Sequence, residues 1–455
     1  MEKVKLLIIG AGPGGYVAAI RAAQLGLDPV VVERLDLGGT CLNKGCIPTK
    51  ALIAAAEVYD AVLNSKTMGV FCEPSFDWIK VVEHAKNAVS KNRKGIQFLF
   101  KKNKIRLVNG VAEFTGTKTV RVGEIEFDAQ NIIIATGSKV KDIPVFAVDG
   151  EKIISSDHAL FQEKLPESIA VIGGGVIGVE MAYIYSTFGV NVTIIEALET
   201  IIPFEDHEVS KELTKEFKKK KIKIYAGVCV EKVVKRDSKM VVILNNGVEI
   251  EVDQVLSSVG RSPNTDGLGL DNAGIETDER GFIRTDSCFR TSVEGVYAVG
   301  DVIATPMLAH TAEHEGISTV EQIAGKDVSP VDYHLNPGCI YCQPSVASIG
   351  YSEREAVEKG IEIKVGKFPF SANGKAVASN HTTGFVKVIT EAEAGKIIGA
   401  HIIGYGATDL ISEFLPAMKL GATVHDIIES IHPHPTLCEA TLEAALNSIG
   451  RTIHM

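Results

Sequence analysis

Apolar runs and helical repeats alternate along the first half of the chain, a pattern typical of strands connected by helices. An apolar run over 4–9 meets a cluster of glycines and is followed by a helical repeat from Tyr16 to Leu25. A second apolar run, 169–172, precedes another glycine cluster and a helical stretch that ends near Gly189. Strand, helix and strand in this order form the βαβ unit of a parallel sheet. The pattern therefore predicts an α/β protein with two such units.

Both glycine clusters match the dinucleotide-binding fingerprint G-x-G-x-x-G, and each is followed by a second strand that ends in a glutamate, Glu33 or Glu196. The second copy lies 163 positions after the first. The glycines are Gly10, Gly12 and Gly15 in the first copy and Gly173, Gly175 and Gly178 in the second. The first glycine of such a unit makes the turn, the second lets the backbone approach a pyrophosphate, and the third lets the helix pack on the strand. Each glutamate is expected to bind a ribose hydroxyl, and the carboxylate of Glu196 would repel the 2′-phosphate of NADP, so we expect NAD there.

Two cysteines five positions apart, Cys41 and Cys46, follow the first unit. On a regular helix this spacing corresponds to a rise of about 7.5 Å, whereas a disulfide needs Cα atoms within roughly 7 Å. A disulfide therefore requires a distorted turn, which Gly45 permits. A small, distorted ring is easily reduced and suits catalytic exchange. The same spacing also fits two unlinked, buried thiols.

The stretch from Gly38 to Lys50 reads Gly-Gly-Thr-Cys-Leu-Asn-Lys-Gly-Cys-Ile-Pro-Thr-Lys. It resembles the redox-active signature of the flavin-dependent pyridine nucleotide-disulfide oxidoreductases, and most closely that of the members that oxidise dihydrolipoyl groups. The resemblance implies FAD in the first unit, NAD in the second, and a redox-active disulfide between Cys41 and Cys46. The further contacts it implies are Gly39, Thr40, Lys50, Ala112, Thr136, Gly137, Ser138, Asp301, Met307, Leu308, Ala309 and His310 for FAD, and Val176, Ile177, Val230 and Gly260 for NAD.

The resemblance also assigns roles to charged residues outside the fingerprints. Lys50 and Glu180 match a pair that forms an ion pair beside the flavin ring in the family. The segment 430–439 resembles the family's His-x-His-Pro-Thr-x-x-Glu, in which the second histidine, here His434, is the acid-base and the glutamate, here Glu439, orients its ring. Read without the resemblance, Lys50 and Glu180 are solvated surface groups, and Thr-x-x-Glu is a capping box that opens the last helix.

Composition narrows the function classes. The chain has 455 residues, 45% hydrophobic and 23% charged, with a formal net charge of -10, which argues against a nucleic-acid-binding protein. No apolar run reaches the roughly 18 residues of a membrane span, and the first residues lead directly into a strand, so we expect no signal peptide and a cytoplasmic protein. Eight cysteines are too sparse for a disulfide scaffold. Cys339 and Cys342 have C-x2-C spacing but no second pair to complete a zinc site, so we expect no metal.

Later patterns predict the remaining elements. Val209, Leu213 and Phe217 recur at helical spacing within 205–220, and 241–252 is typical of a hairpin. Beyond Tyr333 the chain predicts alternating strands, such as 384–390 and 397–403, and then helices. We place those helices over 407–420 and 437–448. The resemblance identifies this region as an interface domain, which implies a homodimer.

Together these observations predict two Rossmann-like dinucleotide-binding domains and a C-terminal α+β interface (dimerisation) domain. The expected boundaries are 1–145 for the FAD-binding domain, 146–262 for the NAD-binding domain, 263–332 for the return of the FAD-binding domain, and 333–455 for the interface domain. The implied function is NAD-dependent oxidation of dihydrolipoyl groups borne by the lipoyl domains of a 2-oxoacid dehydrogenase, acetoin or glycine-cleavage complex. The alternatives are an NAD(P)H-dependent reductase of another disulfide, similar to glutathione reductase, and a mainly structural subunit of such a complex.

Overall fold

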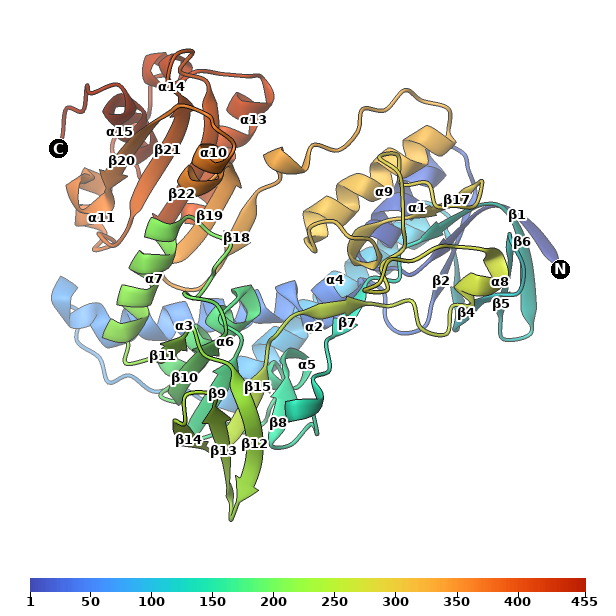
Figure 1. The fold of residues 1–455 in the computed structure, drawn as a ribbon, viewed down its shortest axis with the longest axis horizontal. Helices are drawn as coiled ribbons and strands as arrows, with labels where there is room; N and C mark the ends of the chain where they lie inside the picture. The colour runs from blue at the N-terminus through green and yellow to red at the C-terminus, as the bar shows by residue number, and fades with distance from the viewer.

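The computed structural model describes residues 1–455 as three units, each built on its own sheet (Figure 1). The first sheet has the order β3-β2-β1-β6-β5-β4, with β17 beside β6. Its strands are β1 (Glu2–Ile9), β2 (Pro29–Glu33), β3 (Arg106–Asn109), β4 (Ala112–Phe114), β5 (Thr119–Val122), β6 (Ile125–Ile134) and β17 (Val296–Ala298). The pairs formed among β1, β2, β3, β6 and β17 are parallel, whereas β5 pairs antiparallel with β6 and with β4. Because β17 lies about 160 residues after β6, the chain leaves this unit and returns to it.

Helices cover the first sheet. Helix α1 (Pro13–Gln24) follows β1 directly and packs beside α9 (Ala309–Ile323). The other helices of this part of the chain are α2 (Gly39–Lys44), α3 (Cys46–Asn64), α4 (Trp78–Lys102) and α8 (Leu270–Ala273). The continuous apolar run of β1 is buried on both faces, with Leu6, Leu7 and Ile8 fully enclosed. This burial is the reason that the run lacks the alternation of a half-exposed strand.

The second sheet is parallel throughout, in the order β11-β10-β9-β15-β8. Its strands are β8 (Ile153–Ser155), β9 (Ser168–Ile172), β10 (Asn191–Glu196), β11 (Lys223–Ala226) and β15 (Gln254–Ser257), and its helices are α5 (Ser156–Ala159), α6 (Val176–Thr187) and α7 (His207–Lys219). Helix α7 buries Val209, Leu213 and Phe217, as the spacing predicts. An antiparallel layer of β12 (Val230–Arg236), β13 (Lys239–Leu244) and β14 (Glu249–Val252) lies beside the sheet, and it contains the predicted hairpin.

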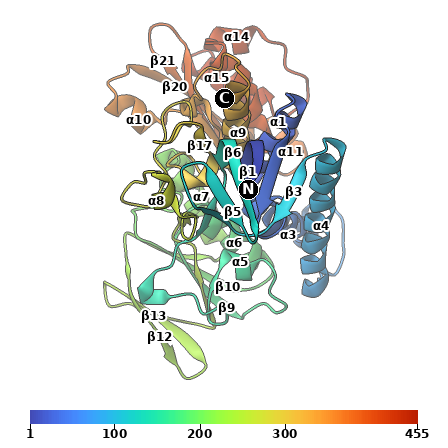
Figure 2. The same ribbon diagram turned by 90° about the vertical axis from the view of Figure 1, so that its right-hand side faces the viewer.

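Two short strands mark the passage between these units. The strands β7 (Ser138–Val140) and β16 (Arg261–Pro263) pair antiparallel. One lies just after the first sheet's β6 and the other just after the second sheet's β15. The chain therefore enters and leaves the second unit at the same place, just after the ends of β6 and β15. Figure 2 shows this second unit below the first sheet, with β12 and β13 at its far end.

The third unit is an antiparallel sheet in the order β18-β19-β22-β21-β20, covered by short helices. Its strands are β18 (Gly338–Ile340), β19 (Ser345–Gly350), β20 (Ile363–Pro369), β21 (Phe385–Glu391) and β22 (Ile397–Gly404). Its helices are α10 (Glu353–Glu358), α11 (Gly374–Ala378), α12 (Ala407–Leu410), α13 (Phe414–Lys419), α14 (Val424–Glu429) and α15 (Glu439–Ser448). None of the molecule's helices combines the length and apolar character that crossing a membrane requires.

The predicted continuous helix over 407–420 is wrong. The segment divides into α12, a 3-10 turn η6 (Ile411–Glu413) and α13. Pro416 supplies the physical reason, because a proline inside a helix lacks the N–H for the residue four positions back and its ring clashes with that carbonyl. By starting a new helix at Phe414, the chain places Pro416 in a first turn, where the N–H is not needed. The other 3-10 turns are η1 (Ser65–Met68), η2 (Pro144–Phe146), η3 (Gly300–Val302), η4 (Tyr333–Leu335) and η5 (Phe370–Ala372).

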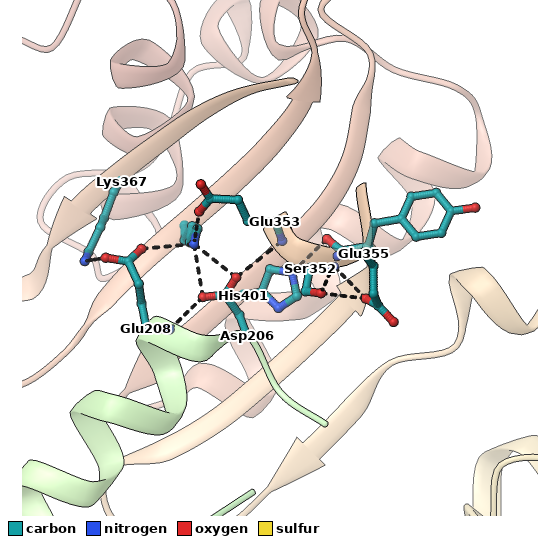
Figure 3. Close-up of polar contacts among 9 residues, drawn as sticks. Asp206, Glu208, Ser352, Glu353, Glu355, Lys367 and His401 are labelled. Carbon is teal, nitrogen blue, oxygen red and sulfur yellow. Dashed lines mark hydrogen bonds and ion pairs between the residues drawn. The ribbon is translucent and has the colours of Figure 1, made fainter. Parts of the chain in front are cut away.

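A buried charge cluster joins the second and third units (Figure 3). The side chain of Lys387 on β21 is 1% exposed, and its Nζ lies 3.0 Å from Asp206 and 2.7 Å from Glu353. Glu208, in the first turn of α7, also lies 3.0 Å from this Nζ. Asp206 in turn caps α7 by accepting a hydrogen bond from the Glu208 N–H. One lysine thus fixes the start of a helix of the second unit to the sheet of the third.

Candidate active site and cofactor cavity

One cavity of about 1670 Å³ extends along both glycine fingerprints and past the two cysteines. This volume exceeds the roughly 300–1,000 Å³ of a pocket for one drug-sized ligand. Every residue predicted to contact FAD or NAD lines it, except Gly15 and Gly178. Cys41, Cys46, Lys50 and Glu180 line it too, whereas His434 and Glu439 do not. Most residues predicted from the sequence therefore line a single cavity, whereas His434 and Glu439 lie on a separate loop.

The two fingerprints have the same geometry. Gly10 and Gly173 have φ values of +103° and +105°, a region that side chains rarely adopt. A Cβ at Gly15 or at Gly178 would lie 1.9 Å from the carbonyl oxygen of the first glycine in its own copy, so these positions require glycine for close packing of helix on strand. This packing explains why neither residue reaches the cavity. At the middle glycines, in contrast, a Cβ would meet only Gly39 Cα at 3.8 Å for Gly12 and nothing within 4 Å for Gly175.

The helices that follow the fingerprints present free N–H groups. Helix α1 begins after Gly12 and α6 begins after Gly175, and neither has a side-chain cap or an acidic residue in its first turn. The first N–H groups of a helix need partners, and the helix dipole favours an anion there. Both starts face the cavity, since Gly12 and Gly175 line it. The residues present therefore fit two pyrophosphate groups, one at each fingerprint.

Glu33 and Glu196, at the ends of β2 and β10, are buried, bind the glycine loops and line the cavity. Glu33 is 8% exposed and Glu196 is 9% exposed. Each carboxylate accepts one hydrogen bond from a backbone N–H inside its glycine loop and one from the residue two positions further on. The donors are Ala11 at 2.7 Å and Leu35 at 2.8 Å for Glu33, and Gly174 at 2.6 Å and Leu198 at 2.8 Å for Glu196. A carboxylate has lone pairs left for a ribose hydroxyl after these two bonds.

Cys41 and Cys46 form a disulfide with a Cα–Cα distance of 4.7 Å. Helix α2 ends at Lys44, and α3 begins at Cys46. Gly45 between them has φ −144° and ψ −111°, which interrupts the helical path. A Cβ there would lie 3.1 Å from the Thr40 carbonyl oxygen. The predicted distortion at Gly45 is confirmed, and the alternative of two unlinked thiols is wrong.

Lys50 extends from α3 toward Glu180 of α6, and both face the cavity. Its Nζ lies 3.0 Å from each oxygen of the Glu180 carboxylate, whose side chain is 4% exposed. Tyr341 was missed by the sequence analysis. Its N–H donates to Glu180 at 2.9 Å, and its ring lies under Lys50, with 4.4 Å from Nζ to the ring centroid. Tyr341 comes from the third unit, so this unit contributes to the wall of the cavity.

Asp301 and Ser138 approach each other from segments 163 residues apart. Ser138 Oγ donates to Asp301 at 2.6 Å, and Arg261 donates to Ser138 Oγ at 2.6 Å. Burial lowers the pKa of Arg261, while the nearby charge of Asp301 opposes this shift. Sequence reasoning missed Arg261, although it is adjacent to the predicted Gly260. The only available signal was that an arginine stands at the exit from the second unit.

His434 and Glu439 lie together on the third unit. His434 is 77% exposed, and its Nδ1 lies 2.8 Å from Glu439 Oε1. The other oxygen of Glu439 accepts a hydrogen bond from the Thr436 N–H at 2.9 Å. Burial opposes ionisation of Glu439, but the hydrogen bonds from Thr436 and His434 outweigh it and lower the pKa of Glu439. The carboxylate is thus kept ionised, and it orients the imidazole.

The capping-box interpretation of this segment is wrong in part. Helix α15 begins at Glu439, after Cys438, rather than after Thr436. Thr436 Oγ1 donates to the Pro433 carbonyl at 2.7 Å instead of capping the helix. Only the reciprocal bond is formed, in which the Thr436 N–H donates to the Glu439 carboxylate. The physical reason is that Thr436 belongs to the turn that presents His434, so its hydroxyl stabilises that turn.

The remaining thiols do not form disulfides. Cys342 is fully buried, and burial raises its pKa well above the usual range of a thiol. Burial likewise raises the pKa of Cys339 to about 11. Neither thiol is in its reactive, ionised form near neutral pH. No group of three or more His, Cys, Asp or Glu residues is arranged to hold a metal ion.

Comparisons with known proteins agree with this geometry. The chain matches the family described as pyridine nucleotide-disulphide oxidoreductase over residues 4–316 and the dimerisation domain of that family over residues 336–445. It is 44% identical over 452 residues to a dihydrolipoyl dehydrogenase of Chlorobaculum parvum, covering 97% of this chain and 96% of that one. It is also 44% identical to a dihydrolipoyl dehydrogenase of Bacillus subtilis, over 99% and 97% of the two chains.

A solved structure supports the fold alone. The crystal structure of LpdA from Mycobacterium tuberculosis matches with a TM-score of 0.91, covering 97% of this chain and 99% of that one, at 24% identity. The family match covers most of the residues that line the cavity, and the dimerisation match covers the third unit. The two matches together cover nearly the whole chain, and the Cys41–Cys46 disulfide lies where both dinucleotide fingerprints meet the cavity. The chain therefore belongs to the pyridine nucleotide-disulphide oxidoreductase family.

Proposed function

We propose that the protein oxidises protein-bound dihydrolipoyl groups to lipoyl disulfides and reduces NAD⁺ to NADH, the activity named in its relatives. The observation that carries this proposal is the Cys41–Cys46 disulfide, which lines the same cavity as both dinucleotide fingerprints. Electrons that enter the chain at a disulfide can reach a nicotinamide only through a cofactor between them. The cavity has the volume for such a relay.

The cofactors are FAD and NAD, as in the family to which the chain belongs. We assign FAD to the first fingerprint, with Glu33 on its ribose and Asp301, together with Met307–His310, beside the rest of the cofactor. We assign NAD to the second fingerprint, with Glu196 on its ribose and Val230 and Gly260 beside it. When bound, FAD supplies the two-electron chemistry that links a dithiol to a nicotinamide.

The residues of the chain then have defined tasks. His434 takes a proton from one dihydrolipoyl thiol, and the resulting thiolate attacks Cys41 Sγ. The Cys41–Cys46 bond breaks, and Cys46 leaves as a thiolate. The second dihydrolipoyl thiol gives its proton to water and, as a thiolate, attacks the lipoyl sulfur of the mixed disulfide, which expels Cys41 as a thiolate. The product is the lipoyl disulfide, and two electrons remain on the cysteine pair.

The protein forms a homodimer through its dimerisation domain. We propose that His434 serves the disulfide of the other subunit. Two observations support this assignment: His434 is 77% exposed, and it lies outside the cavity that contains Cys41 and Cys46 of its own chain. An acid-base on an exposed loop of a dimerisation domain is well placed to reach across an interface. Glu439 orients the ring, and Lys50 with Glu180 sets the charge beside the flavin.

The natural substrate in this proposal is a lipoyl domain of a multienzyme complex. A lipoyl group is a long, flexible arm carried by another protein, and the substrate end of the cavity must therefore admit an extended chain. Which complex supplies it, of the 2-oxoacid dehydrogenase, acetoin or glycine-cleavage type, is a prediction from the resemblance. The domain boundaries and the cytoplasmic location likewise stay predictions.

The test is anaerobic NADH formation by the FAD-loaded dimer with dihydrolipoamide and NAD. We expect rapid turnover with NAD, almost none with NADP, and loss of turnover in Cys46→Ser. Cys72→Ser is the matched control, because Cys72 is an exposed, free thiol outside the cavity. No turnover, with the flavin still reducible by NADH, would contradict the substrate and direct the search to oxidised glutathione and other small disulfides. Unchanged assembly of a partner complex by inactive Cys46→Ser would separate catalysis from a structural role.

A further inference from the structure

The first histidine of the His-Pro-His sequence, His432, has an environment opposite to that of His434. The His432 side chain is 6% exposed, and both of its ring nitrogens have partners. Nδ1 lies 3.0 Å from the Ser430 carbonyl oxygen, and Nε2 lies 2.7 Å from Glu413 Oε1. In His434 only Nδ1 has a partner. The two rings, two positions apart, are therefore used in different ways.

Both partners of His432 are acceptors. A backbone carbonyl never donates, and a carboxylate accepts unless it is protonated. The Glu413 side chain is 26% exposed. Its second oxygen lies 2.6 Å from the Thr441 hydroxyl, which lies at the same distance from the Cys438 carbonyl oxygen. For both contacts to be hydrogen bonds, both ring nitrogens must donate, which is possible only in an imidazolium. The hydrogen bond to Glu413 also raises the pKa of His432.

Glu413 connects this histidine to two other parts of the site. Its partner Thr441 is fully buried on α15, the helix that begins with Glu439, which orients His434. Glu413 itself ends η6, and its neighbours Ile411 and Ser412 line the cofactor cavity. The loop that presents His434 is thus joined through one carboxylate to its orienting helix and to the cavity wall.

We propose that His432 is a positioning residue: a permanent imidazolium that, clamped between Ser430 and Glu413, holds the 430–436 loop so that His434 is presented to its substrate. The inference rests on the proposed role of His434 as acid-base. It adds a division of labour, in which His432 keeps its proton throughout the cycle and His434 exchanges one. A displacement of about 1 Å in a reacting group can cost on the order of a hundredfold in rate, so a loose loop would slow thiol oxidation.

The test compares two activities of the FAD-loaded dimer. Oxidation of dihydrolipoamide by NAD needs His434, whereas reduction of ferricyanide by NADH uses the flavin and the nucleotide site without it. In His432→Gln we expect kcat for dihydrolipoamide to fall by about tenfold or more, with KM for NAD and the ferricyanide activity unchanged. His434→Gln, as the positive control, loses the first activity and keeps the second. His425→Gln changes an exposed histidine of α14 and should alter neither.

Two further variants distinguish a loss of positioning from a general loss of folding in His432→Gln. Glu413→Gln removes the charge on the other side of the pair. Thr441→Val removes the hydroxyl that ties Glu413 to α15, which also contacts the Cys438 carbonyl. If His432 and Glu413 act as one unit, the double variant should oxidise dihydrolipoamide no more slowly than the slower of the two single variants. Full dihydrolipoamide turnover in His432→Gln, or an equal fall in both activities, would overturn the inference. Inactive wild-type enzyme would instead overturn the proposed function.

Discussion

Glu33 and Glu196 occupy equivalent positions in two different sheets and make the same pair of hydrogen bonds to backbone N–H groups of their own loops. Each is nine-tenths buried at the end of the second strand of a βαβ unit. A carboxylate in this place both closes its glycine loop and faces the cavity. Substitution of one glutamate is therefore a control for substitution of the other, because the same chemical change should affect the binding of two different nucleotides.

Glu196→Gln should weaken NAD binding without affecting the flavin. The amide nitrogen of glutamine would face one backbone N–H, and an unpaired buried donor costs about 1–3 kcal/mol. We expect KM for NAD to rise by about tenfold or more while the flavin content per subunit stays at the wild-type value. Initial rates over a series of NAD concentrations, with the flavin absorbance as the reference, make the measurement.

Glu33→Gln is the matched control and should have the opposite profile. Here the damaged loop belongs to the first fingerprint, so the purified protein should contain less FAD, and the fraction that retains FAD should have the wild-type KM for NAD. If Glu196→Gln loses flavin, or if Glu33→Gln changes only the KM for NAD, the assignment of the two nucleotides is reversed.

Substitution of Lys50 should lower the free energy of unfolding more than substitution of Glu180. Lys50→Met leaves the Glu180 carboxylate, 4% exposed, with only the Tyr341 N–H as a partner. Breaking a buried pair in this way costs about 3–5 kcal/mol. Glu180→Gln leaves a lysine that is 31% exposed and can reach water, so its cost should be smaller. Denaturant unfolding of the flavin-loaded dimers measures both, with the exposed Lys219→Met as a control that changes stability by less than about 1 kcal/mol.

The same two variants report on the flavin. If the pair lies beside the isoalloxazine ring, both should slow flavin reduction by NADH in stopped-flow absorbance measurements. Wild-type reduction rates in both variants would contradict that placement. Glu180→Gln proving more destabilising than Lys50→Met would contradict the view that burial of the carboxylate controls the energy of the pair.

The sequence predicted most of the fold because its two strongest signals are local. Apolar runs, glycines and terminal acids specify a βαβ unit within about 30 residues, and Gly45 marks the distorted turn between the cysteines. Pro416 was an equally local signal, and it explains why the predicted helix over 407–420 is divided. The relationships that the sequence could not give are distant ones. Tyr341 meets Lys50 only after three units have packed, and nothing near Arg261 indicated that it would reach Ser138.

Lys387 should be among the residues most important for stability outside the cavity. Its side chain is 1% exposed and contacts Asp206, 3% exposed, so Lys387→Met would leave a buried carboxylate without its counter-ion. We expect the free energy of unfolding to fall by about 3–5 kcal/mol. The loss should separate the second unit from the third, because this lysine joins them. Thermal unfolding followed by flavin fluorescence and by circular dichroism makes the measurement.

Arg354→Ala is the control for that prediction. Arg354 pairs with Glu358 on the surface of the same unit, and the two side chains are 75% and 67% exposed. An exposed pair contributes at most about 1 kcal/mol, so the variant should unfold almost as the wild type does. Equal effects of the two substitutions would mean that burial of Lys387 does not determine the strength of the cluster.

The His432–Glu413 pair predicts a pH dependence of stability whose sign follows from linkage. The hydrogen bond that His432 donates to Glu413 raises the pKa of His432 above its ordinary value of 6.5. A group whose pKa is higher in the folded state binds its proton more tightly there, so its contribution is complete below the unfolded pKa and is lost as the pH rises through the folded pKa. The stability difference between wild type and Glu413→Gln should therefore be largest below about pH 6.5 and shrink on the alkaline side. Denaturant unfolding from pH 5.5 to 9 measures it. A difference that grows with pH would mean that His432 is neutral in the folded protein, and the positioning role argued from its two acceptors would fail with it.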